Sequence, residues 1–125
     1  MDYLANCEFR TATKVDADIH AGGNFFWTTY YDKLKFDNEN LVSFFRVFEK
    51  NNSIELLKEE LLFKGNYDKP KVGYYDVEMT LVHINRKIII RYCGKLIDND
   101  TLICHGYRKF EDTSNYESEI FLKIK

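Results

Sequence analysis

The chain has 125 residues and a formal net charge of −2, and its one compositional excess is aromatic, with ten Phe, nine Tyr and one Trp. This length predicts a single domain over residues 1–125 with a sizeable core. The slightly acidic balance argues against a nucleic-acid-binding protein and against an anionic-membrane binder, because both rely on basic patches. No apolar run is long enough to cross a bilayer as a helix, so no membrane contact is expected.

The cysteine pattern predicts a reducing compartment. Cys7, Cys93 and Cys104 are an odd number without a Cys-x-x-Cys pair, and the N-terminus lacks the pattern of a secretory signal. We therefore expect a cytoplasmic protein, although a mature secreted form that had lost its signal would show the same pattern.

The first fifty residues predict three strands. Apolar and polar residues alternate with a period of two from Cys7 to Ile19, which is typical of a half-buried strand. This strand is long enough to predict a bend or bulge within it. A turn at 22–24 leads to an aromatic-rich strand over 25–37, and a polar loop leads to a third strand over 41–49. The third strand is apolar in both parities, which predicts packing on both sides.

Residues 52–61 break the period of two. Asn52 and Glu55 have the spacing of a capping box, and Ile54, Leu57 and Leu61 follow helical spacing. We therefore predict one short helix, at about residues 53–61, that covers an end of the fold rather than binding a partner. A fourth strand follows over 61–67.

The C-terminal half predicts an antiparallel meander over 74–84, 87–97 and 101–110, and a last strand over 117–125 after a polar loop. If Asn85 and Arg86 form the first turn, Met79 faces Tyr92 on an apolar side. A slip of one residue would oppose apolar and polar faces, so the pattern and the turn support the same register. In the last strand Ile120, Leu122 and Ile124 share one face, and Phe121 points the other way.

The second hairpin of the meander leaves two registers open. With a loop of even length, His105 faces Gly94 and points inward together with Tyr107. With a three-residue loop at 98–100, the inward residues are Cys104, Gly106 and Arg108.

Eight sequential antiparallel strands predict a closed up-and-down β-barrel, because closure removes the sheet edges. An open sandwich of two sheets is the alternative. The segments FKGNY (Phe63–Tyr67) and RYCGKLIDNDTL (Arg91–Leu102) resemble the small calycin-type barrels, which include lipocalins, fatty-acid-binding proteins and the avidin group. The resemblance implies an interior cavity but no family residues, and the lipocalin G-x-W signature is not met at Trp27.

The candidate ligand-binding residues lie at positions that can face such a cavity: Trp27, Tyr30, Met79, Tyr92, His105 and Tyr107. An inward His105 beside tyrosines would suit hydrogen bonding to a ligand or acid–base chemistry. A lone histidine without a carboxylate to orient it is, however, more often structural.

Three charged residues lie in or beside apolar runs. Asp32 follows two tyrosines and would have a raised pKa if it pointed inward, but its ordinary place is at a polar strand end. Arg46 would bind an anionic group if it pointed inward. The first hairpin places Arg91 outward, opposite Thr80.

The sequence assigns no catalytic residue, no metal ligand and no cofactor, because the histidines and cysteines lack metal-binding spacing and no phosphate-binding loop occurs. The leading prediction is therefore a non-enzymatic barrel that binds a small apolar or aromatic molecule. The alternative is a filled barrel that acts as an interaction or inhibitor protein, using outward apolar residues for a protein partner or a homodimer; these residues are Tyr74, Val82, Ile84, Ile89 and Phe121. A small isomerase or cyclase that uses His105 and tyrosines is the weakest of the three.

Overall fold

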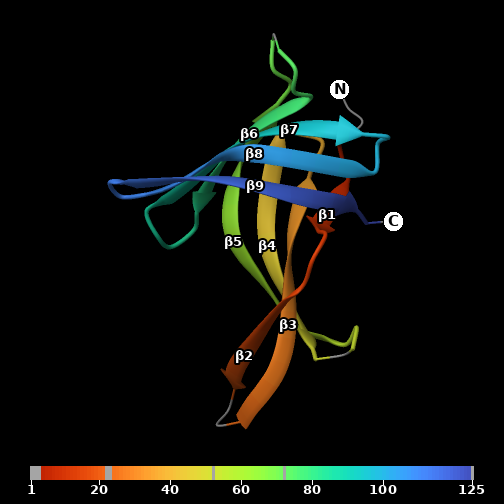
Figure 1. Ribbon diagram of the computed structural model, residues 1–125, viewed down its shortest axis with the longest axis vertical. Helices are drawn as coiled ribbons and strands as arrows, with labels where there is room; N and C mark the ends of the chain where they lie inside the picture. Colours follow the sequence, from red (N-terminus) through yellow and green to blue (C-terminus); the bar gives the residue numbers. More distant parts are fainter. Residues whose placement is uncertain (1–3, 22–23, 52, 72, 125) are drawn as a thin grey trace.

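The computed structural model describes residues 4–21, 24–51, 53–71 and 73–124, which form an all-β structure (Figure 1). The strands are β1 (Glu8–Thr11), β2 (Val15–Ala21), β3 (Asn24–Phe36), β4 (Leu41–Lys50), β5 (Leu56–Asp68), β6 (Val77–His83), β7 (Ile88–Ile97), β8 (Thr101–Phe110) and β9 (Thr113–Lys123). They pair in the order β1-β9-β8-β7-β6-β5-β4-β3-β2, with a further pairing between β1 and β3.

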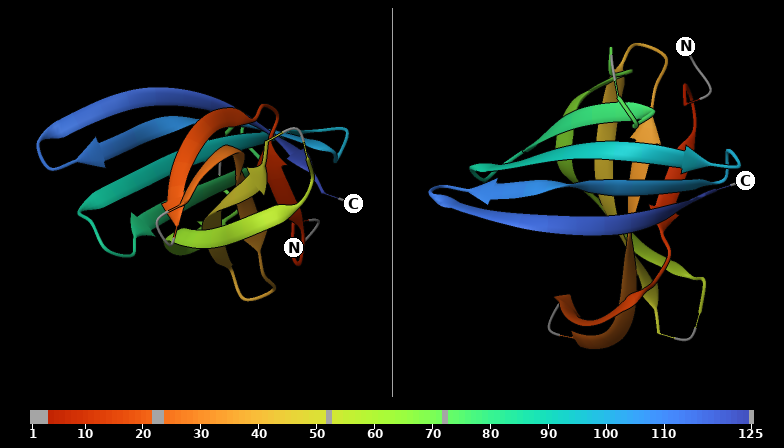
Figure 2. Two further views of the ribbon diagram at one scale, coloured as in Figure 1. Left: turned by 90° about the horizontal axis from the view of Figure 1, so that it is seen from below. Right: turned by 45° about the horizontal axis from the view of Figure 1, so that its top comes forward.

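The short strand β1 closes the sheet into a barrel. Phe9 faces Lys123 of β9 on one side and Leu34 of β3 on the other. The predicted closed, eight-stranded antiparallel barrel is therefore confirmed, and β2 is one strand more, paired with β3. Figures 1 and 2 show β2 and the first part of β3 projecting from the barrel as a two-stranded arm.

The N-terminal segment, for which the sequence predicts a bend or bulge at an unspecified position, is interrupted between Thr11 and Val15. β1 ends at Thr11 and β2 begins at Val15, and both strands pair with β3. The Thr11 hydroxyl accepts a hydrogen bond from the Asp32 N–H at 3.0 Å and donates one to the Thr13 carbonyl at 3.2 Å. A side chain therefore bonds to the backbone across the break. The Gly22–Gly23 part of the predicted turn lies outside the described residues.

The predicted helix at residues 53–61 is wrong, because the described residues contain no helix and β5 begins at Leu56. The Ser53 hydroxyl accepts a hydrogen bond from the Glu55 N–H at 2.9 Å, so the apparent capping sequence makes a turn. Cross-strand contacts then favour the strand: Lys33 lies 2.6 Å from Glu59, and Lys58 covers the ring of Phe48. Tertiary pairing thus overrides a local helical pattern.

Strand β4 is apolar in both parities, and its pairing with β5 contains two register shifts. The pairing moves from Phe44–Phe63 to Phe45–Leu61, and again between Phe48 and Glu49. Each shift skips one residue of β5 and none of β4. Residues of both parities are buried in β4, among them Val42 and Val47.

The Asn85–Arg86 hairpin has the predicted register, with Met79 facing Tyr92 and Thr80 facing Arg91. The next hairpin has the three-residue loop, because Ile97 pairs with Thr101. Asp98 and Asn99 adopt φ values of 52° and 62°, a left-handed conformation that these two residue types tolerate better than most. Cys104, not His105, therefore faces Gly94, and the inward placement of His105 and Tyr107 is wrong.

The last strand starts earlier than predicted and faces the other way. A tight turn at 111–112 lets Phe110 pair with Thr113, so the predicted polar loop is mostly strand. Phe121 pairs with Leu102 and is buried, whereas Ile120, Leu122 and Ile124 are exposed. The register of β8 decides this facing, because Leu102 already belongs to the interior.

The interior is filled by apolar side chains from all eight barrel strands and from Leu4 before β1, and all of them are buried: Leu4, Phe9, Leu34, Phe36, Val42, Phe44, Phe63, Tyr67, Val77, Met79, Leu81, Ile90, Tyr92, Leu102, Cys104 and Phe121. Rings pack edge to face, as in the Phe36–Tyr67 pair with centroids 4.9 Å apart. No helix in the described part of the chain is long and apolar enough to cross a membrane.

Candidate functional site

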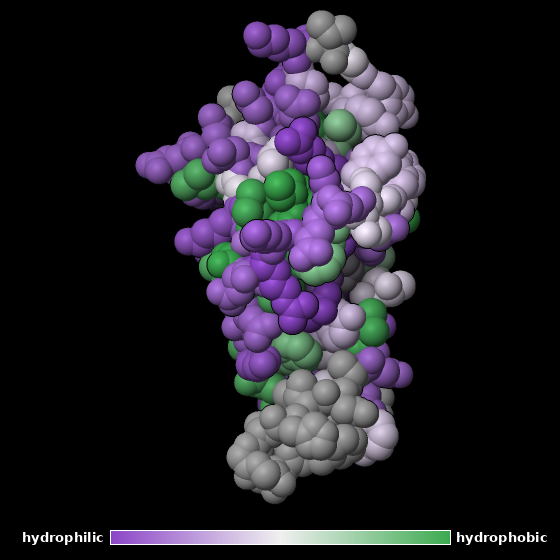
Figure 3. All heavy atoms as spheres, turned by 90° about the vertical axis from the view of Figure 1, so that its left-hand side faces the viewer, coloured by the Kyte–Doolittle hydropathy of each residue, from purple (hydrophilic) through white to green (hydrophobic). Residues whose placement is uncertain are grey.

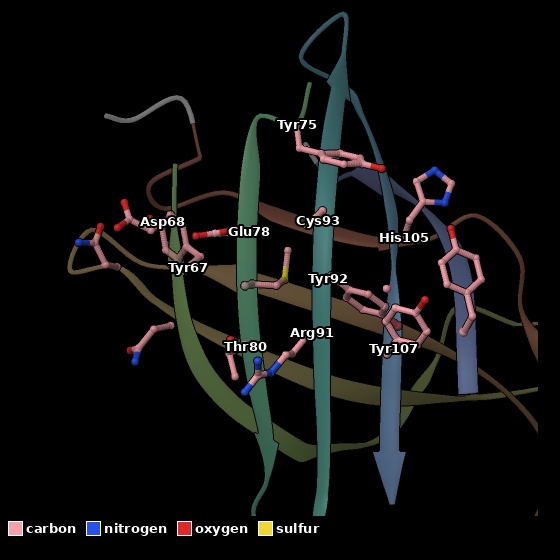
Figure 4. A pocket seen from close by; sticks show the side chains of 15 residues that line it. Tyr67, Asp68, Tyr75, Glu78, Thr80, Arg91, Tyr92, Cys93, His105 and Tyr107 are labelled. Carbon is pink, nitrogen blue, oxygen red and sulfur yellow. The ribbon is translucent and has the colours of Figure 1, made fainter. Parts of the chain in front are cut away.

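The strongest candidate site is a groove of about 800 Å³ on the outer face of β5–β9 (Figure 4). Strand pairing arranges the outer side chains in two cross-strand rows. The first row contains Asn66, Thr80, Arg91, Tyr107 and Tyr116. The second row contains Asp68, Glu78, Cys93, His105 and Ser118. We call this surface the tyrosine groove, because its side chains include Tyr75, Tyr107 and Tyr116.

A continuous series of rings runs along the tyrosine groove. Centroid distances are 6.4 Å from Tyr75 to His105, 6.4 Å from His105 to Tyr116 and 5.4 Å from Tyr116 to Tyr107. Tyr107 and Tyr116 are 55% and 61% exposed, so most of each ring is free to contact a ligand. Figure 4 shows Tyr75, His105 and Tyr107 on the same side of the sheet.

The polar groups of the groove include a histidine–serine contact and a cysteine thiol. His105 Nδ1 lies 2.5 Å from the Ser118 hydroxyl, which holds the imidazole in place on the open face. Among the described residues, no carboxylate is recorded at the other ring nitrogen to orient the pair for acyl transfer. Burial and the nearby Glu78 raise the pKa of the Cys93 thiol, which disfavours the thiolate that a nucleophile requires.

The six predicted ligand-binding residues lie in the interior, in the groove and at two separate positions on β3. Met79 and Tyr92 belong to the buried interior, and His105 and Tyr107 lie on the opposite side of the same sheet, in the groove. Tyr30 packs near Phe48, with ring centroids 5.7 Å apart. Trp27 is 65% exposed on the part of β3 that pairs with β2. The structure thus brings together His105 and Tyr107 but separates them from Trp27 and Tyr30.

A second polar cluster lies inside one end of the barrel and was missed by sequence reasoning. The Tyr92 hydroxyl donates a hydrogen bond to Glu117 Oε1 at 2.5 Å, and Arg108 Nε lies 3.3 Å from the same carboxylate. Burial, strengthened by the hydrogen bond to Glu117, raises the pKa of Tyr92. The three-residue loop places Arg108 inward, so the correct register of that hairpin would have revealed the pair.

Asp32 and Arg46 form an ion pair, with Arg46 Nε 2.9 Å from Asp32 Oδ1. Arg46 also covers the Tyr30 ring at 4.1 Å. Burial lowers the pKa of Arg46, but the hydrogen bond to Asp32 and its charge outweigh this effect and raise it. The sequence did not decide the facing of Arg46, and in the structure its positive charge is balanced by Asp32 of the same chain. Arg91 is outward, as predicted.

Within the described residues, no group of three or more histidine, cysteine and acidic side chains is placed to hold a metal ion. Comparisons with protein-family models, with curated proteins and with solved structures found no match for this chain. The candidate site therefore rests on its own geometry.

Proposed function

We propose that this chain is a non-enzymatic interaction protein, a filled barrel that presents the tyrosine groove to a protein partner. The observation that carries the proposal is the series of rings from Tyr75 to Tyr107 on the outside of a packed barrel, in which Tyr107 and Tyr116 are exposed. Tyrosine is enriched at interfaces because it combines a large apolar ring with a polar tip and loses little conformational entropy.

The packed interior supports this proposal over a ligand inside the barrel. Leu81, Ile90 and Leu102 have no exposed area, so an apolar ligand there would have to displace core side chains. The resemblance to calycin-type barrels agrees with the closed barrel and supports a binding role by analogy only. The three free thiols, which form no disulfide, support the expectation of a cytoplasmic protein.

A small aromatic molecule in the groove is the second candidate, favoured by the groove volume of about 800 Å³. Small-molecule sites typically have volumes of roughly 300–1,000 Å³, but such sites enclose most of the ligand's surface. The tyrosine groove opens along the outer face of the sheet, which suits a longer partner segment better.

Selection from a displayed random-peptide library tests the proposal. Peptides retained by the wild-type protein should bind the Tyr107→Ala variant about 10-fold or more weakly, as expected for an aromatic anchor. The matched control is Trp27→Ala, which removes an exposed ring far from the groove and should leave the affinity unchanged. Equal binding to Tyr107→Ala would contradict the proposal. A rise in melting temperature with small aromatic compounds, without any selected peptide, would favour the second candidate.

A further inference from the structure

Strand β9 has one edge that is paired along only part of its length. On one side β9 pairs with β8 from Thr113 to Leu122. On the other side β1 pairs only with residues 121–123, and the Ala12 N–H bonds to the Ile120 carbonyl. Within the described part of the chain, no strand pairs with this side of residues 113–119. Figure 1 shows β1 beside the C-terminal end of β9 alone.

The backbone hydrogen bonds at the C-terminal end of β9 show which of its N–H and C=O groups point to this free edge. The Ile120 carbonyl and the Ile124 N–H both bond toward β1, whereas the Lys123 N–H bonds to Asp100 on the β8 side. Backbone groups of successive strand residues point to opposite sides. Because the β8–β9 register has no shift, Ser114, Tyr116 and Ser118 direct their N–H and C=O groups to the free edge.

The segment that carries this edge is acidic. Between Lys109 and Lys123 the chain has four acidic residues and no basic one: Glu111, Asp112, Glu117 and Glu119. Glu117 is paired with Arg108, but among the described residues no cation is recorded within ion-pair distance of Glu119. Burial and the charges of Asp32 and Glu117 raise the pKa of Glu119. A cation supplied by a partner would therefore stabilise the ionised form of this carboxylate.

We propose that the free edge of β9, residues 113–119, binds an extended basic segment of the partner protein as an added β-strand. This inference rests on the proposed interaction function and specifies the partner's chemistry. The added strand would bond to the backbone of Ser114, Tyr116 and Ser118. Its side chains would alternate between two contacts, one with the acidic inner residues and one with the tyrosine groove.

Charge complementarity selects this occupant over a second copy of the chain. Pairing β9 with β9 would bring two acidic segments together, and like charges on paired strands are destabilising. Inward-pointing charges on an edge strand also discourage unselective pairing. Arginine suits both contacts, because it pairs with carboxylates and stacks on tyrosine rings such as Tyr116.

The test uses the full chain and a synthetic peptide of about ten residues in which arginine alternates with threonine, a sequence that favours an extended strand. A matched peptide carries glutamate in place of arginine. We expect the arginine peptide to bind about 10-fold or more tightly than the glutamate peptide and to weaken with added salt. Bound peptide should slow amide hydrogen exchange at Ser114, Tyr116 and Ser118.

The matched variants are Ser118→Pro and Ser118→Ala. Both lose the hydroxyl that contacts His105, but only proline removes the edge N–H, which takes no part in the β8 ladder. Ser118→Pro should bind the arginine peptide about 10-fold more weakly than Ser118→Ala. If Ser118→Pro does not fold, the exchange pattern of the wild-type protein decides.

Equal affinity of the two folded variants, or binding without slowed exchange at the edge amides, would overturn the inference. A peptide-free dimer protected at the same amides would overturn it as well, since a second copy would then occupy the edge. These failures differ from failure of the proposed function, which would appear as equal binding of selected peptides to wild type and Tyr107→Ala.

Discussion

The inner and outer faces of β6–β9 consist of alternate residues of the same four strands. Inward residues such as Leu81, Ile90 and Phe121 are buried within one packed cluster. Their outward neighbours include exposed tyrosines, and on the face in Figure 3 apolar side chains occur in small groups among hydrophilic ones. The difference teaches that the inside of this barrel stabilises the fold, whereas the outside is available for binding.

The largest expected difference between the two faces is at neighbouring positions of β9. Phe121→Ala should lower the free energy of unfolding by about 3–5 kcal/mol, because it leaves a cavity in the core. Leu122→Ala removes an exposed side chain on the opposite face and should cost less than about 1 kcal/mol. Urea denaturation measures both values, and similar losses would contradict the assigned facing of β9.

The close approach of β7 and β8 predicts the next largest effect. A Cβ at Gly106 would lie 1.7 Å from the Arg91 carbonyl oxygen, so the two strands would have to shift. Gly106→Ala should therefore cost about 2–3 kcal/mol in thermal or chemical unfolding. At Gly94 the nearest atoms belong to the side chains of Leu102 and Val77, which can adjust. Gly94→Ala should be the milder variant, and the reverse order would contradict this packing.

The polar cluster inside the barrel predicts an intermediate effect. Tyr92→Phe removes a buried hydroxyl that bonds to Glu117, and a hydrogen bond to a charged group contributes about 1.5 kcal/mol or more. Tyr107→Phe makes the same chemical change on the exposed face and should be close to neutral. Calorimetric unfolding measures the stability of both variants. A loss of stability in Tyr107→Phe as large as that in Tyr92→Phe would contradict this prediction.

Replacement of Glu119 should change the stability least, and this change should depend on pH. Its folded-state pKa is raised, chiefly by burial, so ionisation costs stability as the pH rises through the raised value. Glu119→Gln should therefore raise the melting temperature at pH 7 by about 1–3 °C, with a smaller gain at pH 4, where the carboxyl is largely protonated in both states. Glu111→Gln makes the same charge change at the exposed hairpin tip and is the control. A loss of stability at pH 7 would show that Glu119 is favourably paired.

Alternation and turn residues predicted the barrel and the register of the Asn85–Arg86 hairpin, because that hairpin separates apolar and polar sides. The Asp98–Asp100 hairpin could not be settled, since Gly94, Cys104 and His105 all fit beside an apolar face. Two left-handed residues, Asp98 and Asn99, decide the register, and asparagine and aspartate permit this conformation without requiring it.

The helix that was wrongly predicted at residues 53–61 shows a second limit of sequence reasoning. Lys58, Glu59 and Glu60 look like the exposed side of a helix, but in the barrel Glu59 reaches Lys33 across the sheet. Such contacts join segments distant in sequence, so local spacing cannot predict them. The tyrosine groove was missed for the same reason, because its rows combine residues from five strands.

The most direct test of the central claim is an NMR titration of the wild-type protein with a selected peptide. If the outer face is the binding surface, ring resonances of Tyr75, Tyr107 and Tyr116 will shift and saturate together. The methyl resonances of Leu81, Ile90 and Leu102 will keep their positions. Saturable shifts of those methyl groups, with the tyrosine rings unchanged, would place the ligand inside the barrel and contradict the account.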